Sequence, residues 1–326
     1  MIVYQKSLKI LFSILLIIAF GYISGSRTGG LDYDEYLIMF SYILEESTFE
    51  GSVSVAKDPI IGFILYFLRP FIDTDFVIVF LFIALLGAVG KYLTLDKFER
   101  FSLFFLLYIL LLSPSLDFAA IRAMIALSFF GASLKFKVDN KKKLYFLFSL
   151  LSVLSHISLI VGVVLASDYV QKIILKYRYQ FVILVLVVGL QGKSILSSFS
   201  NTSTYINDSG SLFAIIPVFL FFITLVVYKK EFYKPLNDFN SVAFDVSFVV
   251  AIIALVLSPL VVVASFRFLQ ISQYVFLLAL CSTNLSRTNN DNKRLIWFFM
   301  VFLYSLPLLY RNLDLKLWQY ALDSIM

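Results

Sequence analysis

The chain has 326 residues, of which 60% are hydrophobic, 17% aromatic and only 15% charged. This composition excludes a soluble globular protein, and long apolar runs separated by short charged stretches predict an all-α, polytopic integral membrane helical bundle. The net charge of +6 is assigned to lysines and arginines of cytoplasmic loops rather than to nucleic-acid binding. The single cysteine, Cys281, lies inside an apolar run, which excludes a disulfide framework and a thiolate metal site.

About eleven segments are predicted to cross the roughly 30 Å of hydrocarbon in a bilayer, although some are short for this. The predicted spans are 8–25, 76–92, 101–113, 117–135, 140–155, 157–175, 179–195, 211–228, 241–258, 260–282 and 294–310. The first span follows Lys6 and Lys9 but lacks a small-x-small cleavage site, so an uncleaved anchor is expected. Residues 59–72 are too short to cross, and they are predicted to form a half-penetrating or surface helix that begins at Asp58-Pro59. One transmembrane domain, 1–326, is therefore expected.

Lysines and arginines near the span ends predict the orientation of the bundle. The N-terminus is placed in the cytoplasm, and loop 26–58, with two basic and seven acidic residues, is placed outside. The later basic clusters all become cytoplasmic only if 59–72 does not cross and the run 144–166 breaks near Ser155–Ser158. We therefore expect two short helices that meet at the outer face at His156. Loops 26–58 and 193–210 are then periplasmic or extracellular.

The first polar stretch of any length begins at Arg27, directly after the first span. The Gly29-Gly30 pair allows a sharp turn that holds Asp32 close to Arg27. Asp32 is therefore a candidate reactive carboxylate, whereas Asp34 and Glu35 are more simply interpreted as a solvated acidic loop.

Three tyrosines of the outer loops are candidates for stacking against sugar rings: Tyr33, Tyr36 and Tyr205. The alternative interpretation is an aromatic belt at the membrane interface.

Arg122 and Arg267 lie inside apolar segments, where ionisable groups are costly and usually face a cavity or a partner. Each arginine has a structural alternative as part of a salt bridge, for instance Arg122 with Asp117 or Asp245. The planar guanidinium fork suits phosphate oxygens, so these two arginines together with Arg27 predict a phosphate or pyrophosphate site.

His156 is the only histidine of the chain. Its functional interpretation is a general base or a phosphate contact, and its structural alternative is a hydrogen bond between helices. No second histidine is present to complete a zinc site, so no metal is predicted. The absence of a Walker loop, a dinucleotide fingerprint and a G-x-S-x-G motif also leaves no cofactor predicted and nucleotide-driven chemistry unsupported.

Five short motifs, in their order and spacing, resemble the EpsG family of Wzy-type bacterial polysaccharide polymerases. These motifs are Arg27-x-Gly29-Gly30-x-Asp32-Tyr33-x-x-Tyr36, Asp58-Pro59-Ile-Ile-Gly62-Phe63, Ile121-Arg122-Ala-x-x-Ala126, Ser155-His156-x-Ser158 and Phe266-Arg267-Phe268. The resemblance runs from about residue 10 to about residue 310. Where the family often has Glu-Pro-Gly, this chain has Asp58-Pro59-Ile, which leaves the role of Asp58 open.

The resemblance implies a glycosyltransferase of GT-C-like architecture in the bacterial inner membrane. Such an enzyme joins undecaprenyl-diphosphate-linked repeat units on the periplasmic face without a sugar nucleotide, to make O-antigen, capsule or exopolysaccharide. Donor and acceptor glycans on this carrier and membrane lipid are the implied partners, with a chain-length regulator and a flippase as further candidates.

The same resemblance suggests a role for each candidate residue. Arg122 and Arg267 would bind the diphosphate with help from Arg27, because negative charge grows on this leaving group in the transition state. His156 or Asp32 would orient or deprotonate the acceptor hydroxyl.

Three other functions compete with a polymerase. An O-antigen ligase usually carries a larger outer domain than loop 26–58 provides. A flippase for lipid-linked oligosaccharide is expected to show charges at many depths and internal repeats, which are not evident here. A structural membrane protein without chemistry does not account for Arg122 and Arg267.

Overall fold

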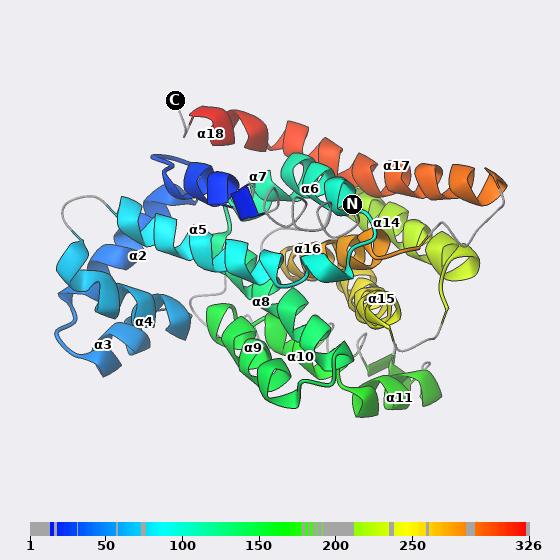
Figure 1. Ribbon diagram of the computed structural model, residues 1–326, viewed down its shortest axis with the longest axis horizontal. Helices are drawn as coiled ribbons and strands as arrows, with labels where there is room; N and C mark the ends of the chain where they lie inside the picture. Colours follow the sequence, from blue (N-terminus) through cyan, green and yellow to red (C-terminus); the bar gives the residue numbers. More distant parts are fainter. Residues whose placement is uncertain are drawn as a thin grey trace, which may run out of the picture. The chain divides into compact units, whose positions relative to one another are not determined.

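The computed structural model describes residues 14–323 except 16–17, 31, 57, 73–75, 178–179, 182, 185–186, 188–190, 192–211, 235–237, 259–260 and 285–290. The described chain is helical throughout and contains no strand (Figure 1). It divides into two compact units, one built from 1–97, 108–160 and 311–326, and the other from 98–107 and 161–310.

The first unit contains the helices that carry most of the sequence-predicted site. These are α2 (Tyr33–Glu45), α3 (Phe49–Val55), α4 (Pro59–Leu68), the 3-10 turn η1 (Arg69–Phe71), α5 (Val77–Tyr92), the 3-10 turn η2 (Leu95–Lys97), the π-helical turn η3 (Tyr108–Leu112), α7 (Ser113–Leu116), α8 (Ile121–Val138), α9 (Lys142–Ser155) and α18 (Leu317–Asp323). Residues 18–25 are also helical and precede the Arg27 loop.

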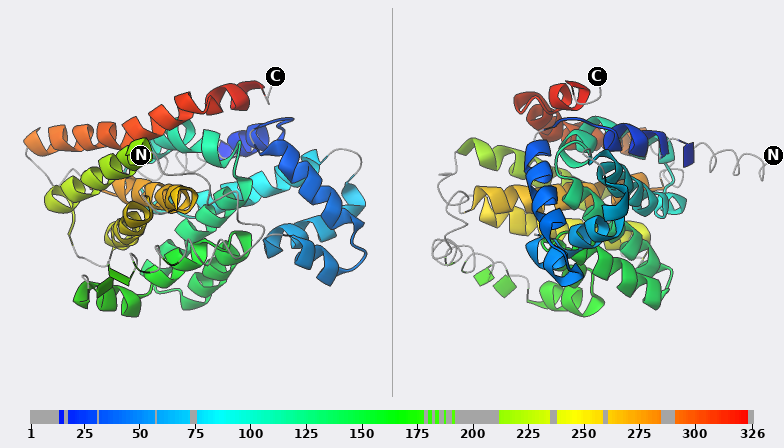
Figure 2. Two further views of the ribbon diagram at one scale, coloured as in Figure 1. Left: turned by 180° about the vertical axis from the view of Figure 1, so that it is seen from behind. Right: turned by 90° about the vertical axis from the view of Figure 1, so that its left-hand side faces the viewer.

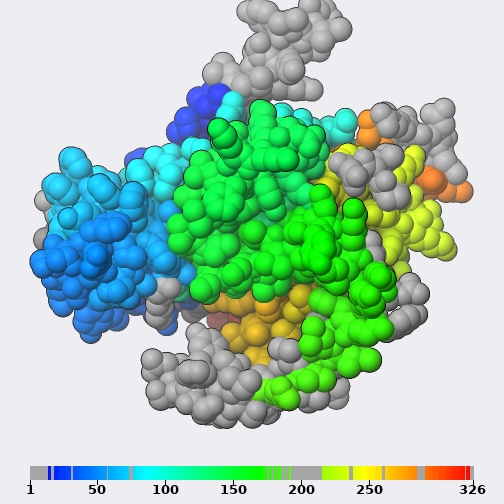
Figure 3. Space-filling view, turned by 90° about the horizontal axis from the view of Figure 1, so that it is seen from below, coloured from blue at the N-terminus to red at the C-terminus, as the bar shows by residue number. Residues whose placement is uncertain are grey.

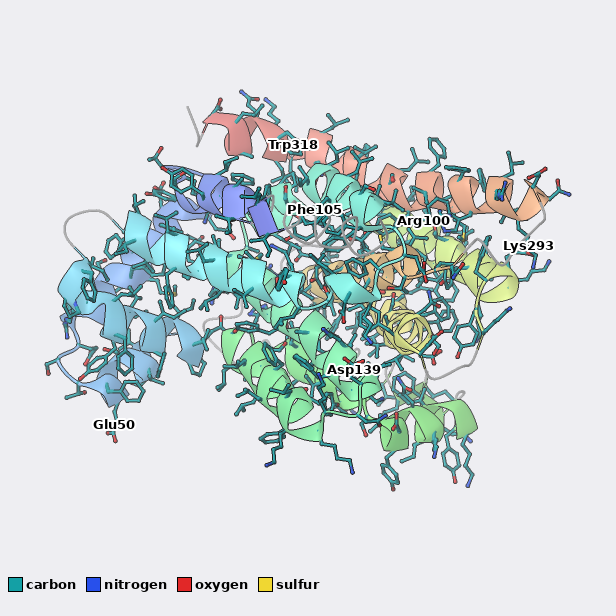
Figure 4. The ribbon with its side chains drawn as sticks, in the orientation of Figure 1. Glu50, Arg100, Phe105, Asp139, Lys293 and Trp318 are labelled. Carbon is teal, nitrogen blue, oxygen red and sulfur yellow. The ribbon has the colours of Figure 1, made fainter. Side chains whose placement is uncertain are left out.

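Helices α5 and α8 run in the same direction and pack closely in the first unit. A Cβ atom on Gly90 would lie only 2.8 Å from the backbone carbonyl carbon of Ser128, so glycine is required for this approach. Small residues at helix contacts are the usual means of packing helices closely in a membrane. At the C-terminal ends of the pair, Lys97 contacts Asp139 (labelled in Figure 4), and Lys135 lies 2.9 Å from Asp96.

Helix α9 has the polarity of a helix that faces lipid. Its buried residues are three serines, Ser149, Ser152 and Ser155, whereas bulky apolar side chains such as Phe146 are exposed. Ser152 donates a hydrogen bond of 2.7 Å to the carbonyl of Ala126, which fastens α9 to α8. A small, polar inner face with an apolar outer face is expected where the surroundings are hydrocarbon rather than water.

Helices α2, α3 and α4 form a cluster beside α5 in the first unit (Figures 1 and 2). Thr48 caps α3, because its hydroxyl accepts a hydrogen bond from the N–H of Gly51. Pro59 occupies the first turn of α4, as predicted from the sequence. On the face shown in Figure 3, this cluster (blue) adjoins the side chains of the α8–α9 region (green).

The π-helical turn disturbs the regular ladder of backbone hydrogen bonds, and side chains near the C-terminus satisfy the carbonyls there. Asn312 donates to the carbonyl of Leu111 at 3.0 Å. Trp318, labelled in Figure 4, donates to the carbonyl of Leu110 at 3.2 Å. These bonds dock the end of the chain, including α18, onto the η3–α7 segment.

The second unit is built around a pair of long apolar helices. Its elements are α6 (Phe101–Leu107), α11 (Asp168–Lys176), α14 (Leu212–Glu231), α15 (Phe239–Leu257), α16 (Val262–Cys281) and most of α10 (Leu159–Leu165) and α17 (Asp291–Asp314). The hydroxyls of Ser247 and Ser272, 2.9 Å apart, join α15 to α16. Arg100, labelled in Figure 4, lies over the ring of Trp297 at 4.1 Å from its centroid.

Four of the described helical segments are long and apolar enough to cross a membrane: Val77–Lys97, Phe239–Leu257, Val262–Cys281 and Asp291–Asp314. Pro59–Phe71 and Phe101–Leu116 are apolar but shorter. The helical class predicted from the sequence is therefore confirmed. The number of about eleven spans and the GT-C-like architecture stay predictions.

Candidate functional site

A buried carboxylate joins the two most prominent sequence candidates of the first unit. One oxygen of Asp58, Oδ2, accepts a hydrogen bond of 2.7 Å from Nη1 of Arg122. The same oxygen lies 3.5 Å from Nδ1 of His156. The Asp58 side chain is only 3% exposed, compared with 22% for Arg122 and 20% for His156. The three residues therefore form a partly open, charged cluster around a nearly closed carboxylate.

The packing of α8 against α9 explains why Arg122 and His156 meet. The hydrogen bond from Ser152 to Ala126 fixes the register of these antiparallel helices. One helical turn after Ser152 on α9 is His156, and one helical turn before Ala126 on α8 is Arg122. The antiparallel pairing therefore brings these two residues to the same level. The predicted break at His156 is present, since α9 ends at Ser155, His156 is extended (φ −163°, ψ 113°) and α10 begins at Leu159.

Asp58 reaches this pair because α4 packs against α9. It occupies the N-cap position of α4, as predicted, but its side chain makes no capping hydrogen bond to the helix. Burial alone raises the pKa of the Asp58 carboxyl, but the interactions with His156 and Arg122 outweigh burial, and the pKa lies below its ordinary value. The carboxylate is therefore charged at neutral pH, as an ion-pair partner of Arg122 must be.

The salt-bridge alternative for Arg122 is thus correct in kind, but the partner is Asp58 rather than Asp117 or Asp245. The pairing uses one guanidinium nitrogen, and Nε of Arg122 is buried without a hydrogen-bond partner among the described residues. A guanidinium can present five N–H donors in a fork, so donor capacity is left for a second anion.

Tyr36 lies under the guanidinium of Arg122, whose central carbon is 5.7 Å from the ring centroid. The tyrosine is 4% exposed. Burial raises the pKa of the Tyr36 hydroxyl, while the charge of Arg122 and a hydrogen bond with it act in the opposite direction. Tyr36 therefore remains a neutral phenol at physiological pH and serves as a cation–π support for Arg122.

Arg27 is completely buried, at 0% exposure, and supports the turn that precedes α8. Its Nη1 donates to the carbonyl of Asp117 at 3.3 Å, and its guanidinium carbon lies 5.0 Å from the centroid of the Phe80 ring. Burial lowers the pKa of Arg27 to about 10, so the guanidinium stays charged at neutral pH. Gly30 has φ of +126°, and a Cβ atom there would lie 2.6 Å from the carbonyl oxygen of Phe118. The Gly29-Gly30 turn thus lies directly against the 117–118 backbone.

Asp32 and Tyr33 are brought to the same neighbourhood. Asp32 is partly exposed, and its carboxylate opposes the lowering of the Arg27 pKa by burial. The ring of Tyr33 stacks on that of Phe80, with centroids 5.1 Å apart. The expected proximity of Asp32 to Arg27 is therefore present, whereas Asp34 and Glu35 are exposed.

A second buried carboxylate, Asp117, lies close to Arg27. The sequence offered it as a partner for Arg122, but it pairs with Lys91 instead. Asp117 accepts from Nζ of Lys91 at 2.8 Å through Oδ1, and from the hydroxyl of Tyr108 at 2.5 Å through Oδ2. Lys91 lies at the end of the predicted span 76–92, yet its side chain is only 6% exposed. Lys91 and Asp117 are 26 residues apart, so only the fold reveals the pair.

Two further predicted residues are not among the described residues of the first unit. Arg267 belongs to the second unit, where it is an exposed residue of α16. Tyr205 and the whole of loop 193–210 fall outside the described residues. Among the described residues, no group of three or more histidine, cysteine, aspartate or glutamate side chains is arranged to hold a metal ion.

Apolar helices long enough to span a bilayer, together with a charged cluster buried among helices, define a polytopic membrane protein with an internal polar site. The chain belongs to the EpsG family, whose model matches residues 9–322. Members of this family are relatives of Wzy-type polymerases, and membership assigns the chain to the membrane proteins of polysaccharide biosynthesis. No curated protein and no solved structure matches the chain.

Proposed function

We propose that this protein is a polysaccharide polymerase that joins undecaprenyl-diphosphate-linked oligosaccharide repeat units by glycosyl transfer. The observation that carries the proposal is the incomplete pairing of Arg122: the guanidinium hydrogen-bonds Asp58 and Tyr36, but Nε has no partner among the described residues. A half-buried cation with an unused donor suits a phosphate oxygen, and family membership supports a lipid-linked glycan as the substrate.

In this proposal, Arg122 stabilises the leaving group. As the glycosidic bond to the diphosphate breaks, negative charge grows on the phosphate oxygens, and a preorganised guanidinium lowers the free energy of that state. The ring of Tyr36 packs against the guanidinium of Arg122. Arg27 stabilises the turn before α8 through its hydrogen bond to the carbonyl of Asp117. Arg267 is proposed as a further diphosphate contact on the basis of its sequence motif.

His156 is the preferred residue for orienting or deprotonating the acceptor hydroxyl. It lies at a break between helices, is partly exposed and is adjacent to a carboxylate, which are the features expected of a general base. Asp32 is the second candidate, since it is also partly exposed and close to Arg27. Tyr33 and Tyr205 are proposed as glycan contacts, whereas Tyr36, which is buried against Arg122, is proposed as a support for the guanidinium instead.

The periplasmic face of the inner membrane is the proposed location of the reaction. Arg122 and Lys135 lie thirteen residues apart on α8, about 20 Å along its axis. The lysine-rich end of α8 suits the cytoplasm by the distribution of basic residues, so the Arg122 end faces the opposite side.

The test is a polymerisation assay with the purified protein in liposomes and an undecaprenyl-diphosphate-linked repeat unit, read on a gel as a ladder of glycan lengths. We expect a ladder without nucleotide or ion gradient, loss of the ladder in Arg122→Ala, and full activity in Arg294→Ala. Arg294 is a suitable control because its side chain is 56% exposed and pairs only weakly with the exposed Asp291.

Each rival function gives a different result in the same assay. A substrate that stays at one repeat but changes leaflet indicates a flippase. Transfer of glycan only to an added lipid A core indicates a ligase. A ladder of full length from Arg122→Ala would contradict the diphosphate role of that arginine.

A further inference from the structure

The two nitrogen-bearing side chains of the cluster meet at a single carboxylate oxygen. Arg122 and His156 both contact Oδ2 of Asp58, at 2.7 and 3.5 Å respectively. The two contacts are unequal, because a nitrogen–oxygen hydrogen bond is normally 2.7–3.2 Å long. Arg122 therefore holds this oxygen, and Nδ1 of His156 is buried without a hydrogen-bond partner among the described residues.

A buried ring nitrogen without a partner is costly, so the arrangement favours a second state. If the guanidinium of Arg122 turned toward another anion, Oδ2 of Asp58 would be released. It would then lie within a small movement of Nδ1 of His156. A hydrogen bond from Nδ1–H to the carboxylate would fix the imidazole tautomer and leave Nε2 as the proton acceptor.

We propose that Asp58 is a positioning residue that couples diphosphate binding to the activation of His156. When the donor diphosphate draws the Arg122 guanidinium away, Asp58 exchanges its partner and orients His156 for proton transfer. This inference rests on the proposed polymerase function. It explains why one carboxylate lies between an anion-binding residue and a base, rather than beside only one of them.

The bonding changes of the step can be written completely. The acceptor hydroxyl oxygen forms a bond to the anomeric carbon of the donor, and its proton passes to Nε2 of His156. The bond from the anomeric carbon to the diphosphate oxygen breaks, and its electron pair leaves with the diphosphate, next to Arg122. The resulting imidazolium is paired with Asp58, and its proton is lost when the products leave.

Neither neighbouring carboxylate can substitute for Asp58 in this exchange. Both oxygens of Asp117 are occupied by their own donors, Lys91 and Tyr108. Asp32 interacts electrostatically with Arg27 and Tyr36, and within the described part of the chain no hydrogen bond or ion pair joins it to His156.

The test measures the affinity for undecaprenyl diphosphate and the turnover, because the proposal expects loss of the Asp58 charge to affect them differently. In Asp58→Asn, Arg122 loses its competing anion, so undecaprenyl diphosphate should bind at least as tightly as in the wild type. Turnover should nevertheless fall about 100-fold, because general-base assistance is typically worth a factor of 10² or more. Asp58→Glu, which restores a carboxylate, should recover part of the turnover.

Asp139→Asn serves as the matched control. Asp139 is also paired with a cation in the first unit, but at the other end of α8. Its substitution should change neither undecaprenyl-diphosphate affinity nor turnover. A double-mutant cycle adds an independent check: in a His156→Ala background, Asp58→Asn should cause almost no further loss of turnover, since Asp58 acts through His156.

The outcomes separate the coupling from the function on which it rests. Equal losses of affinity and turnover in Asp58→Asn, or full additivity with His156→Ala, would overturn the coupling while leaving the polymerase intact. If the wild type does not bind undecaprenyl diphosphate, or Arg122→Ala binds it equally well, the diphosphate role itself fails. If Asp58→Asn does not fold, His156→Ala decides alone: unchanged affinity with reduced turnover supports the coupling, and reduced affinity contradicts it.

Discussion

Two carboxylates of the first unit are buried to nearly the same extent but are paired in different ways. Counted over the whole residue, Asp117 is 3% exposed and Asp58 is 2% exposed. Each oxygen of Asp117 has its own donor, from Lys91 and from Tyr108. In contrast, one oxygen of Asp58 is contacted by both Arg122 and His156.

In the proposed mechanism, the Asp117 pair is structural and the Asp58 cluster is functional. A fully satisfied buried network has one favoured arrangement and makes the fold rigid. A carboxylate oxygen contacted by both an arginine and a histidine can pair with either one, and a bound anion can select between these two arrangements. In this proposal, the number of partners for each oxygen, rather than burial or charge, distinguishes the functional carboxylate from the structural one.

The largest effect is expected from Asp117→Ala, which would leave Lys91 buried without a counter-charge. Breaking a buried ion pair in this way typically costs about 3–5 kcal/mol. The variant should unfold at a much lower temperature than the wild type in detergent, as measured by thermal unfolding. Asp58→Ala should lower the midpoint by less, because the Arg122 side chain that it leaves unpaired is 22% exposed whereas that of Lys91 is 6% exposed. Equal destabilisation by the two substitutions would remove the distinction between the two carboxylates.

A smaller loss is expected from Gly30→Ala in the turn beneath Arg27. Positive φ and the 2.6 Å approach to the Phe118 carbonyl oxygen both disfavour a side chain here. Strain of this kind costs on the order of 1–3 kcal/mol. The unfolding midpoint should fall and polymer yield per folded molecule should drop, because the turn that leads into α8 shifts. Gly21→Ala, whose Cβ would meet only ordinary contacts of 3.6 Å or more, is the control.

The role of the Lys91–Asp117 pair can also be tested by removing both charges together. Replacement of a complete buried ion pair by apolar residues of similar size is often close to neutral. The double variant Lys91→Met with Asp117→Leu should therefore be more stable than Asp117→Ala and within about 2 kcal/mol of the wild type. A thermal midpoint no higher than that of the single variant would show that Asp117 contributes more than charge pairing.

The smallest effect is expected at the Lys97–Asp139 pair, whose side chains are 24% and 21% exposed. Partly exposed pairs usually contribute about 1 kcal/mol or less. Lys97→Ala should leave glycan length unchanged and shift the unfolding midpoint only slightly. A large loss of polymer would indicate that the functional region extends along α8 to its C-terminal end.

Local signals were sufficient for part of this structure. The distribution of basic residues predicted a break at His156, and the helices end and restart there. The cost of a charge in an apolar segment singled out Arg122, and the Gly29-Gly30 turn predicted the proximity of Asp32 to Arg27.

The pairings themselves depended on long-range packing. Asp58 and Arg122 are 64 residues apart, and the Asp-Pro sequence is equally consistent with an ordinary helix cap. Lys91 resembles any basic residue at the end of a span until α5 is packed against α8. Which buried charges pair with each other depends on how the helices are aligned when they pack. The hydrophobic periodicity of the sequence does not specify this alignment.

The most direct measurement is the length distribution of glycan made by Arg122→Ala in liposomes, with equal amounts of folded wild type and Arg294→Ala beside it. A ladder from both reference proteins and only the single repeat unit from Arg122→Ala is the result expected of a polymerase that recognises a lipid diphosphate. Ladders of equal length from all three proteins would contradict it.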